Sequence, residues 1–384
     1  MSDTGGAGAA RPAREGADGE AETLPRLPRS APSASLRHVN FTRATLSGLL
    51  AVTIAACNSG AGAVPEHLRP RVDFGYPTDT TLRMNDVQVK ATHNSYHVET
   101  EGNGVAEWHY THAPFDVQLD TQGVRSFELD LHRNFEDGTF EVFHIPRLDE
   151  GSRCRKFKDC LTALKTWSDA NPGHAPLYVM IEPKEEPPTD AEEYFDAMEQ
   201  EVLAVWPRDW IVAPADVQRD APTLRAAVTG RGWPLLGEVR GTVLFFLNDA
   251  ANFRDRYTRG GHSVTNRLMF PQAIDENDPL AAIFVLNDPV GDGPAITSAV
   301  AHGFIVRTIT DGYDGIDPAI VSAALATGVH ILSTDHPVPT DAAQVGDVSL
   351  TIPGGTPSRC NPVRDIAGCT STAIEDPGRL RAPR

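Results

Sequence analysis

The most chemically suggestive run in the chain is residues 93–96, where a histidine, an asparagine, a serine and a tyrosine follow directly on an apolar, strand-like segment. A second histidine, His144, lies near the end of another such segment. An imidazole can take up and release protons near neutral pH, while amide and hydroxyl groups can bind phosphate or a hard cation. We therefore expect His93 and His144 to take part in phosphoryl chemistry.

Acidic side chains interrupt two further apolar segments. Glu128 and Asp130 lie two residues apart in one segment, and Glu182 and Lys184 do so in another. Residues i and i+2 of a strand share a face, so each pair is predicted to point the same way. A buried carboxylate is costly unless it is paired or binds a metal. Pairing with Arg125 or Lys184 is one outcome, but two acids on one face favour a divalent cation.

Four of these side chains offer oxygen donors of the kind that hard cations prefer. Calcium accepts about six to eight oxygen ligands, so four side chains leave positions for water and for a substrate oxygen. The two histidines would then flank the ion as acid–base groups acting on a phosphate ester. The predicted ligands are Asn94, Glu128, Asp130 and Glu182.

Eight apolar, β-rich runs recur along the chain and predict the elements that position these residues. They cover residues 87–92, 124–131, 140–145, 177–183, 242–248, 281–287, 304–309 and 329–334. Helical patterns separate several of them, one over 157–167 and another after Thr189, with Glu192 completing a capping box. Strands that alternate with helices predict a (β/α)8 barrel, whose strand ends carry the active site.

One connection does not fit a regular barrel. Residues 132–139 are too few for a crossover helix, and Asp137-Gly138 favours a hairpin. We therefore predict an irregular (β/α)8 TIM-type barrel as a single catalytic domain over residues 84–340. A hairpin would bring His144 beside Asp130.

Residues 92–96, Glu128-Leu129-Asp130, His144 and Glu182 resemble, in order and near-spacing, the phosphoinositide-specific phospholipase C superfamily, and most of all its bacterial calcium-dependent branch. The resemblance covers residues 84 to about 340 and ends in the run 333–336. It implies an enzyme that cleaves phosphatidylinositol, a phospholipid at a membrane surface, between diacylglycerol and phosphate. The inositol 2-hydroxyl would attack phosphorus, and a cyclic inositol phosphate would form first.

The resemblance also implies calcium as cofactor, held by the four ligands above, and His93 and His144 as catalytic groups. One histidine would stabilise the pentavalent phosphorane and the other would protonate the diacylglycerol oxygen. Glu128 or Glu182 would take the proton of the 2-hydroxyl. Lys184 and Arg307 are further expected to contact phosphate or inositol, although without calcium the Lys184 ammonium would replace the ion.

Two other functions fit parts of the pattern. A glycerophosphodiester phosphodiesterase on the same barrel usually begins with His-Arg-Gly, whereas this chain has His93-Asn94-Ser95. A non-catalytic, lipid-anchored binding module would not need two histidines and three acids. The strand-end pairs Asn248-Asp249 and Asn287-Asp288 would contact inositol or, as we favour, cap helices. The remaining histidines lack acidic neighbours and are expected to be structural: His97, His109, His112 and His132.

Charge and the N-terminal region indicate where the protein works. Acidic residues outnumber basic ones by 52 to 34, and the net charge of −18 argues against a nucleic-acid partner. Residues 1–35 lack periodicity, so we expect them to be disordered or to precede a translation start near Val39. Residues 36–57 have a signal-peptide pattern whose apolar run is too short to span a membrane. Their end resembles a lipobox, which predicts an envelope lipoprotein anchored at Cys57; the alternative is secretion.

Four cysteines remain beyond the predicted anchor. Cys154 lies near Cys160 and Cys360 near Cys369, and an even number in an exported protein favours two local disulfides. A metal site is the alternative, but the spacing matches no zinc pattern. We expect a linker over residues 58–83 and a C-terminal extension over 341–384 that holds the second disulfide.

Overall fold

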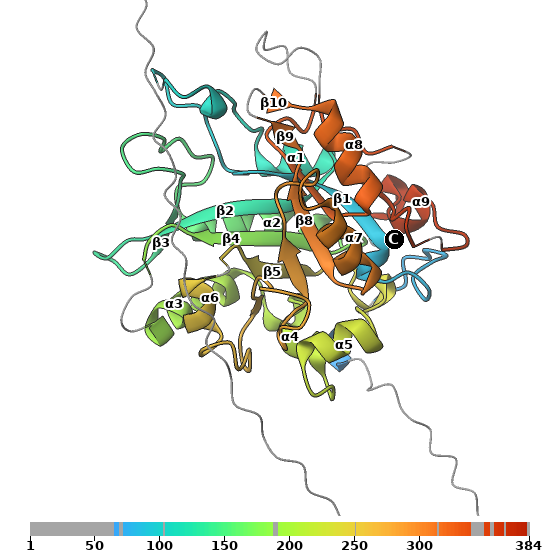
Figure 1. The fold of residues 1–384 in the computed structure, drawn as a ribbon. Helices are drawn as coiled ribbons and strands as arrows, with labels where there is room; N and C mark the ends of the chain where they lie inside the picture. Colours follow the sequence, from blue (N-terminus) through green and yellow to red (C-terminus); the bar gives the residue numbers. More distant parts are fainter. Residues whose placement is uncertain are drawn as a thin grey trace, which may run out of the picture. The chain divides into compact units, whose positions relative to one another are not determined.

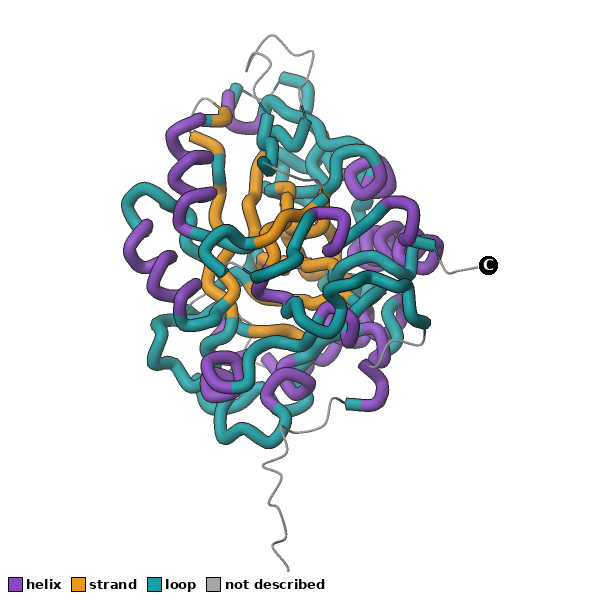
Figure 2. Tube along the Cα trace, turned by 90° about the vertical axis from the view of Figure 1, so that its right-hand side faces the viewer, coloured by secondary structure: helices purple, strands orange, loops and turns teal. Residues whose placement is uncertain are grey.

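The computed structural model describes residues 65–68, 72–102, 104–186, 191–249, 251–312, 315–338, 349–353, 357–364 and 366–381. Our predictions for the N-terminal extension, the signal peptide and Cys57 concern residues outside these ranges. In the described part of the chain, eight parallel strands form a nearly closed barrel with helices on its outside (Figures 1 and 2), so the predicted (β/α)8 fold is confirmed. No helix within these ranges is long and apolar enough to cross a bilayer.

The barrel strands follow the predicted runs closely, except that one predicted run is not a barrel strand and one barrel strand was not predicted. They are β1 (Val87–Thr92), β2 (Val124–Arg133), β4 (Leu177–Pro183), β5 (Val243–Leu247), β6 (Met269–Phe270), β7 (Ile283–Val285), β8 (Ile305–Ile309) and β11 (Ile331–Thr334). Their order is β6-β5-β4-β2-β1-β11-β8-β7, and an isolated bridge from Gln272 to Ile283 links the two ends.

The prediction of a barrel strand over residues 140–145 was wrong. Only β3 (Phe140–Val142) forms, and it pairs antiparallel with β2, with Leu131 opposite Val142. This is the predicted hairpin, and its apolar appearance arises because Phe140 and Val142 are both buried. The missing barrel position belongs to β6, whose two residues were too few to give a strand pattern.

Strand alternation explains why the barrel has two apolar layers. In β4, Tyr178 and Met180 pack inside the barrel with residues of β1, β5 and β8. The alternating residues Val179 and Ile181 point outward and pack with helix residues. The interior face therefore stays apolar up to the carboxyl end of the barrel, where the acids begin.

The helices cover the outer layer. They are α1 (Phe115–Asp120), α2 (Phe157–Ala170), α3 (Ala191–Val205), α4 (Pro214–Gln218), α5 (Leu224–Gly230), α6 (Asn252–Tyr257), α7 (Gly293–Ala301), α8 (Pro318–Thr327) and α9 (Ser371–Ile374). The predicted face of α2 is buried, because Phe157, Leu161 and Leu164 recur at helical spacing. Thr189, the predicted cap of α3, lies outside the described residues.

Short elements complete the chain: β9 (Asp311–Gly312) pairs with β10 (Gly315–Ile316), and β12 (Ser358–Cys360) pairs with β1. The 3-10 helices are η1 (Glu66–Leu68), η2 (Met84–Asp86), η3 (Ala106–Trp108), η4 (Arg208–Trp210), η5 (Leu236–Glu238) and η6 (Pro377–Arg379). The β12 pairing means that the expected C-terminal extension contributes a strand to the barrel sheet.

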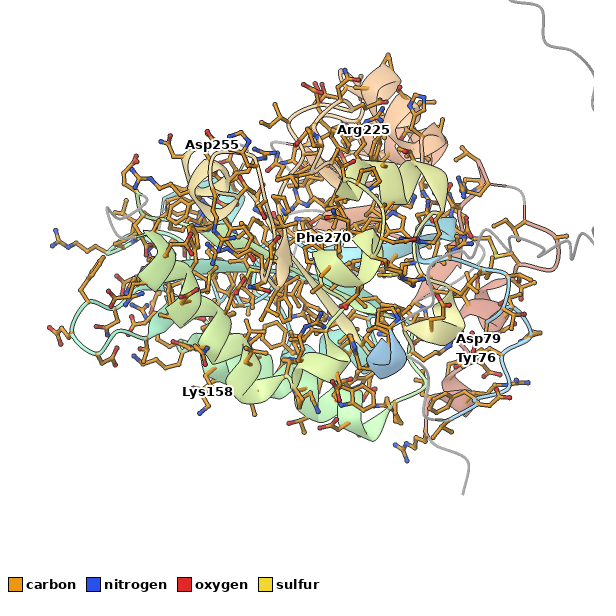
Figure 3. All side chains as sticks on the ribbon, turned by 90° about the horizontal axis from the view of Figure 1, so that it is seen from below. Tyr76, Asp79, Lys158, Arg225, Asp255 and Phe270 are labelled. Carbon is orange, nitrogen blue, oxygen red and sulfur yellow. A yellow bond between two sulfur atoms is a disulfide. The ribbon has the colours of Figure 1, made fainter. Side chains whose placement is uncertain are left out.

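Segments on both sides of the predicted domain pack against the barrel. Tyr76 and Asp79, seen from below in Figure 3, both contact Arg240, whose guanidinium carbon lies 3.7 Å from the Tyr76 ring centre. At the other end, the buried Glu375 accepts a hydrogen bond from Nε of Arg125 at 3.0 Å. Residues 72–82 therefore do not behave as a free linker, and the C-terminal segment is part of the folded domain.

Both predicted disulfides are present. Cys154 is bonded to Cys160, and Cys360 is bonded to Cys369. Disulfides of this kind form in oxidising compartments, which supports a location outside the cytoplasm.

Candidate functional site

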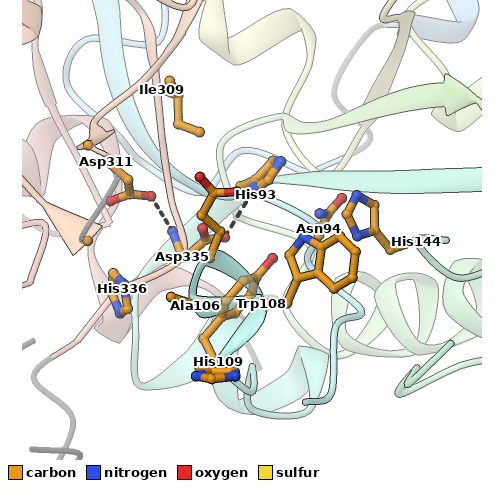
Figure 4. A pocket seen from close by; sticks show the side chains of 14 residues that line it. His93, Asn94, Ala106, Trp108, His109, His144, Ile309, Asp311, Asp335 and His336 are labelled. Atoms are coloured by element: carbon orange, nitrogen blue, oxygen red, sulfur yellow. Dashed lines mark hydrogen bonds and ion pairs between the residues drawn. The ribbon is translucent and has the colours of Figure 1, made fainter. Parts of the chain in front are cut away.

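A pocket of about 840 Å³ opens at the carboxyl end of the barrel. Figure 4 shows it from close by, with the two predicted catalytic histidines among the labelled residues. Its lining residues are His93, Asn94, Ala106, Glu107, Trp108, His109, Tyr110, His144, Ile309, Asp311, Gly312, Gly315, Asp335 and His336. They lie at or after the carboxyl ends of β1, β3, β8 and β11, so segments from both halves of the chain meet at this pocket.

Three carboxylates gather beside the pocket. Glu128 and Asp130 are two residues apart in β2 and both lie on its interior face. The strand register sets Asp130 directly opposite Glu182 of β4. Ligand oxygens of the three side chains lie within 4.8 Å of one another. The structure thus brings together the acids that the sequence predicted.

The Asp130 carboxylate has an unusual environment. It is fully buried, and neither of its oxygens accepts a hydrogen bond of acceptable geometry. Lys184 Nζ lies 2.8 Å from Oδ2 of Asp130 and also contacts Glu182, so it compensates charge without satisfying both oxygens. Burial, together with the neighbouring Glu182, raises the pKa of Asp130 well above its ordinary value. Such a set of oxygens fits a hard cation.

The turn after β1 places Asn94 near these acids. Asn94 is buried and adopts φ +41°, a left-handed conformation that asparagine tolerates better than most residues. Ser95 locks the turn to β2, because its N–H donates to the Glu128 carbonyl at 3.0 Å and its Oγ accepts from the Glu128 N–H at 2.8 Å. Ser95 therefore has a structural role, and its contacts bring Asn94 beside Glu128.

His93 lies between two carboxylates. Its Nδ1 is 3.0 Å from Oδ1 of Asp335, and its Nε2 is 3.9 Å from Oε1 of Glu128. Burial alone would lower the pKa of His93, but Asp335 and Glu128 raise it to about 10. His112, expected to be structural, donates from Nε2 to the His93 carbonyl at 2.7 Å. The His93 ring is therefore held as an imidazolium at the pocket wall.

His144 lines the pocket from the loop that follows β3. Its Nδ1 is 3.0 Å from Oδ2 of Asp149, and the edge of the Trp108 ring packs against it with 5.3 Å between ring centres. Burial lowers the pKa of His144 despite the opposing effect of Asp149. The two histidines thus face one pocket with their proton affinities shifted in opposite directions.

Arg307 lies behind the carboxylates and not among the pocket-lining residues. Its guanidinium, 3% exposed, donates to Glu128 Oε2 at 2.6 Å, to Ser333 Oγ at 3.0 Å and to Asn287 Oδ1 at 2.5 Å. These contacts hold Glu128 in place. Any effect of Arg307 on a substrate would pass through Glu128.

Several residues near the site were not predicted as functional. Asp335 could have been found, because it ends the last strand in the same way that His93 ends the first. Asp149 gave no signal, since it sits in an irregular loop. Asn248 donates to Glu182. The adjacent Asp249 lies two residues before the N-cap Ala251 of α6 and accepts the N–H groups of Ala251 at 2.8 Å and of Arg254, in the first turn of the helix, at 3.1 Å.

Solved structures share this fold. The calcium-dependent phosphoinositol-specific phospholipase C of a Gram-negative Pseudomonas species is 20% identical, with 75% of this chain and 98% of that chain aligned and a TM-score of 0.55. Its myo-inositol complex gives 18% identity over 75% of this chain and 98% of that one, with a TM-score of 0.54. The Ca2+-dependent phosphatidylinositol-specific phospholipase C of Streptomyces antibioticus is 18% identical, with 66% of this chain and 95% of that chain aligned and a TM-score of 0.52. At these identities the likeness shows the fold.

Sequence comparison identifies the family. No curated protein sequence matches the chain. The family profile of the Ca2+-dependent phosphoinositide phospholipases C, in contrast, matches residues 82–142 and 132–362. These ranges make up more than half of the chain and include every site residue described above. The chain therefore belongs to the calcium-dependent phosphoinositide phospholipase C family.

Proposed function

We propose that the pocket cleaves phosphatidylinositol into diacylglycerol and a cyclic inositol phosphate, with His93 and His144 as the catalytic groups. One observation carries this assignment: both imidazoles face the same pocket, each is backed by a carboxylate, and a trio of acids lies beside them. The arrangement supplies proton transfer and charge stabilisation on one phosphate ester.

The residues that would hold Ca2+ are Asn94, Glu128, Asp130 and Glu182. The buried, unsatisfied oxygens of Asp130 support this assignment, because an oxygen-rich site of net negative charge fits a hard divalent ion. When bound, the ion would acidify the inositol 2-hydroxyl and offset negative charge on the phosphate.

The two histidines would divide the work according to their surroundings. His93, protonated between Asp335 and Glu128, suits stabilisation of negative charge on the phosphorane oxygens. His144, whose pKa is lowered by burial, exchanges its proton more easily and suits protonation of the diacylglycerol oxygen. These roles give each ring the protonation state that its task requires.

A carboxylate would accept the proton of the 2-hydroxyl. We favour Glu128 as this base, because Arg307 holds its Oε2 and leaves Oε1 toward His93. Both oxygens of Glu182 are already used, one by Lys184 and the other by Asn248. Glu182 remains the alternative base.

Lys184 would contact the substrate phosphate only after its ammonium leaves Asp130 and Glu182. Arg307 would act on the inositol ring through Glu128, since its guanidinium is buried behind that side chain. Both residues therefore support the site by way of its carboxylates.

The test is an assay of the full chain on phosphatidylinositol with calcium and with a chelator. We expect cyclic inositol phosphate only when calcium is present. Turnover of glycerophosphodiesters with chelator would favour the alternative phosphodiesterase. Lipid binding without any turnover would favour a non-catalytic module.

We also propose that the protein is an envelope lipoprotein anchored through Cys57. The sequence pattern around Cys57 supports this, and the two disulfides agree with export. Expression in a bacterial host should place the protein in the membrane fraction, and Cys57→Ser should release it or leave it unprocessed. Fractionation that is identical for both proteins would contradict the anchor.

A further inference from the structure

We infer that Asp149 and His97 form a positioning pair that holds His144 in one tautomer, with Nδ1 protonated and Nε2 directed at the pocket. This inference rests on the proposed function of His144. It adds two residues to the site, neither of which lines the pocket and one of which we expected to be merely structural.

The geometry around Asp149 ties the pair to His144. The Asp149 side chain is fully buried, and its Oδ2 lies 3.0 Å from His144 Nδ1 and 2.9 Å from His97 Nε2. Backbone hydrogen bonds in both directions between Ile145 and Asp149, at 3.0 and 2.9 Å, close the turn that carries them. The carboxylate is therefore fixed relative to the ring that it contacts.

His97 fixes the Asp149 carboxylate from a second direction. Its Nδ1 lies 2.9 Å from the Tyr110 carbonyl, and its Nε2 lies 2.9 Å from Asp149 Oδ2. Both neighbours of the ring are hydrogen-bond acceptors, so the imidazole is held between them and its Nε2 donates to the carboxylate. The buried carboxylate is thereby held by His97 as well as by its own turn.

The Asp149 carboxylate in turn selects the tautomer of His144, because it lies 3.0 Å from Nδ1. The carboxylate accepts from Nδ1 and thereby keeps a proton there, which leaves Nε2 as the nitrogen that gains and loses protons. A buried aspartate holds the catalytic histidine of serine proteases by the same physical means. The Trp108 ring edge restricts rotation of the imidazole from the other side.

A purely structural role would give a different result on substitution. If Asp149 only closed the loop, its removal would lower stability and leave the His144 tautomer unchanged. The test therefore combines steady-state kinetics on phosphatidylinositol with NMR of isotope-labelled histidine, which reports which ring nitrogen of His144 carries the proton. NMR is recorded at a pH where His144 is neutral.

For Asp149→Ala in the full chain, we expect kcat to fall on the order of 100-fold with KM nearly unchanged. The His144 signals should move from the Nδ1-protonated tautomer to a mixture. His97→Gln removes the imidazole that holds Asp149 but can still donate one hydrogen bond to the carboxylate, so we expect a smaller loss of about 10-fold. It also serves as the test variant if Asp149→Ala does not fold.

The matched control is Thr100→Val. The Thr100 hydroxyl touches the same carboxylate, 3.4 Å from Oδ1, but contacts neither histidine. Its kcat and the His144 tautomer should match the wild type. The inference is overturned if His144 keeps the Nδ1-protonated tautomer in Asp149→Ala, or in His97→Gln where only that variant folds. A wild type that shows this tautomer but cleaves no phosphatidylinositol would refute the proposed function alone.

Discussion

The ammonium of Lys184 lies 2.8 Å from Oδ2 of Asp130, on the same side of the barrel end where Glu182 projects. It therefore occupies the position in which the acid trio needs positive charge. A calcium ion bound by these oxygens would compete with the Lys184 ammonium for the same carboxylates. The protein thus carries its own cation at the site that we propose for calcium.

Replacing Lys184 by methionine should separate the two cations. Breaking a buried ion pair by removing one partner costs about 3–5 kcal/mol, so calcium-free Lys184→Met should be less stable than the wild type. Calcium should bind the variant more tightly, by on the order of 10-fold, because no ammonium has to be displaced. Urea unfolding with chelator and calorimetric calcium titration measure these effects.

The control for this experiment is Lys165→Met. Lys165 is 15% exposed and pairs with Asp169, which is 63% exposed and stays hydrated when the lysine is removed, so losing this pair should cost little stability. It should change neither the unfolding free energy nor calcium binding appreciably. Weaker calcium binding by Lys184→Met would instead mean that Lys184 helps to hold the ion.

The barrel-end acids show how far sequence reasoning reaches. Glu128 and Asp130 were predictable because a carboxylate in an apolar strand needs a cation, and strand alternation sets both on one face. Glu182 was predicted by the same argument, because it also lies in an apolar strand. The parallel register then placed it opposite Asp130, as the shared strand ends led us to expect.

The parts that could not be predicted have physical reasons. The strand β6 contains only Met269 and Phe270, which is too short for any periodicity. The hairpin strand β3 imitates a barrel strand because Phe140 and Val142, which share one of its faces, are both buried. Asp149 lies in a loop whose shape depends on a five-residue turn and on contacts with His97, so nothing near it in sequence reports its role.

Removing either catalytic imidazole should abolish most activity without unfolding the protein. Because general acid–base groups act mainly in the transition state, His93→Ala and His144→Ala should each lower kcat by about 100- to 10,000-fold. Steady-state assays measure the loss, and circular dichroism checks the fold. His302→Ala is the control, since that side chain is 61% exposed and lies outside the pocket lining. Turnover near the wild-type rate in His93→Ala would exclude the proposed role.

The C-terminal segment should be required for barrel stability. Glu375 is buried, accepts from Nε of Arg125 at 3.0 Å and accepts the Ala175 N–H at 2.9 Å. Glu375→Ala leaves the buried Arg125 guanidinium without its carboxylate partner, which predicts a loss of about 3–5 kcal/mol in the free energy of unfolding. Asp220→Ala, which breaks an exposed ion pair with Arg231, should cost no more than about 1 kcal/mol. Equal losses in urea unfolding would argue that the segment is peripheral.

Three buried histidines should destabilise the fold in mild acid, because burial disfavours their protonated form. His330 Nδ1 accepts the Val306 N–H at 3.1 Å and its Nε2 donates to the Asn85 carbonyl at 3.0 Å, so the folded ring is neutral. Burial lowers the pKa of His330 from 6.5 to about 4, and those of His112 and His174 to about 4 as well. Between pH 4 and pH 6.5, these three histidines bind protons in the unfolded chain but not in the folded chain. The contribution of these three histidines to the free energy of unfolding should therefore be fully present above pH 6.5 and be lost as the pH falls toward 4.

His330→Gln tests this linkage at one position, because glutamine can hydrogen-bond but does not titrate. A pKa unit corresponds to about 1.4 kcal/mol, so His330 contributes up to about 3 kcal/mol of the acid-dependent loss. Urea unfolding of the wild type and the variant across this pH range should show a shallower decline for His330→Gln, whatever its stability at neutral pH. Parallel curves for the two proteins would mean that His330 takes up its proton in the folded state.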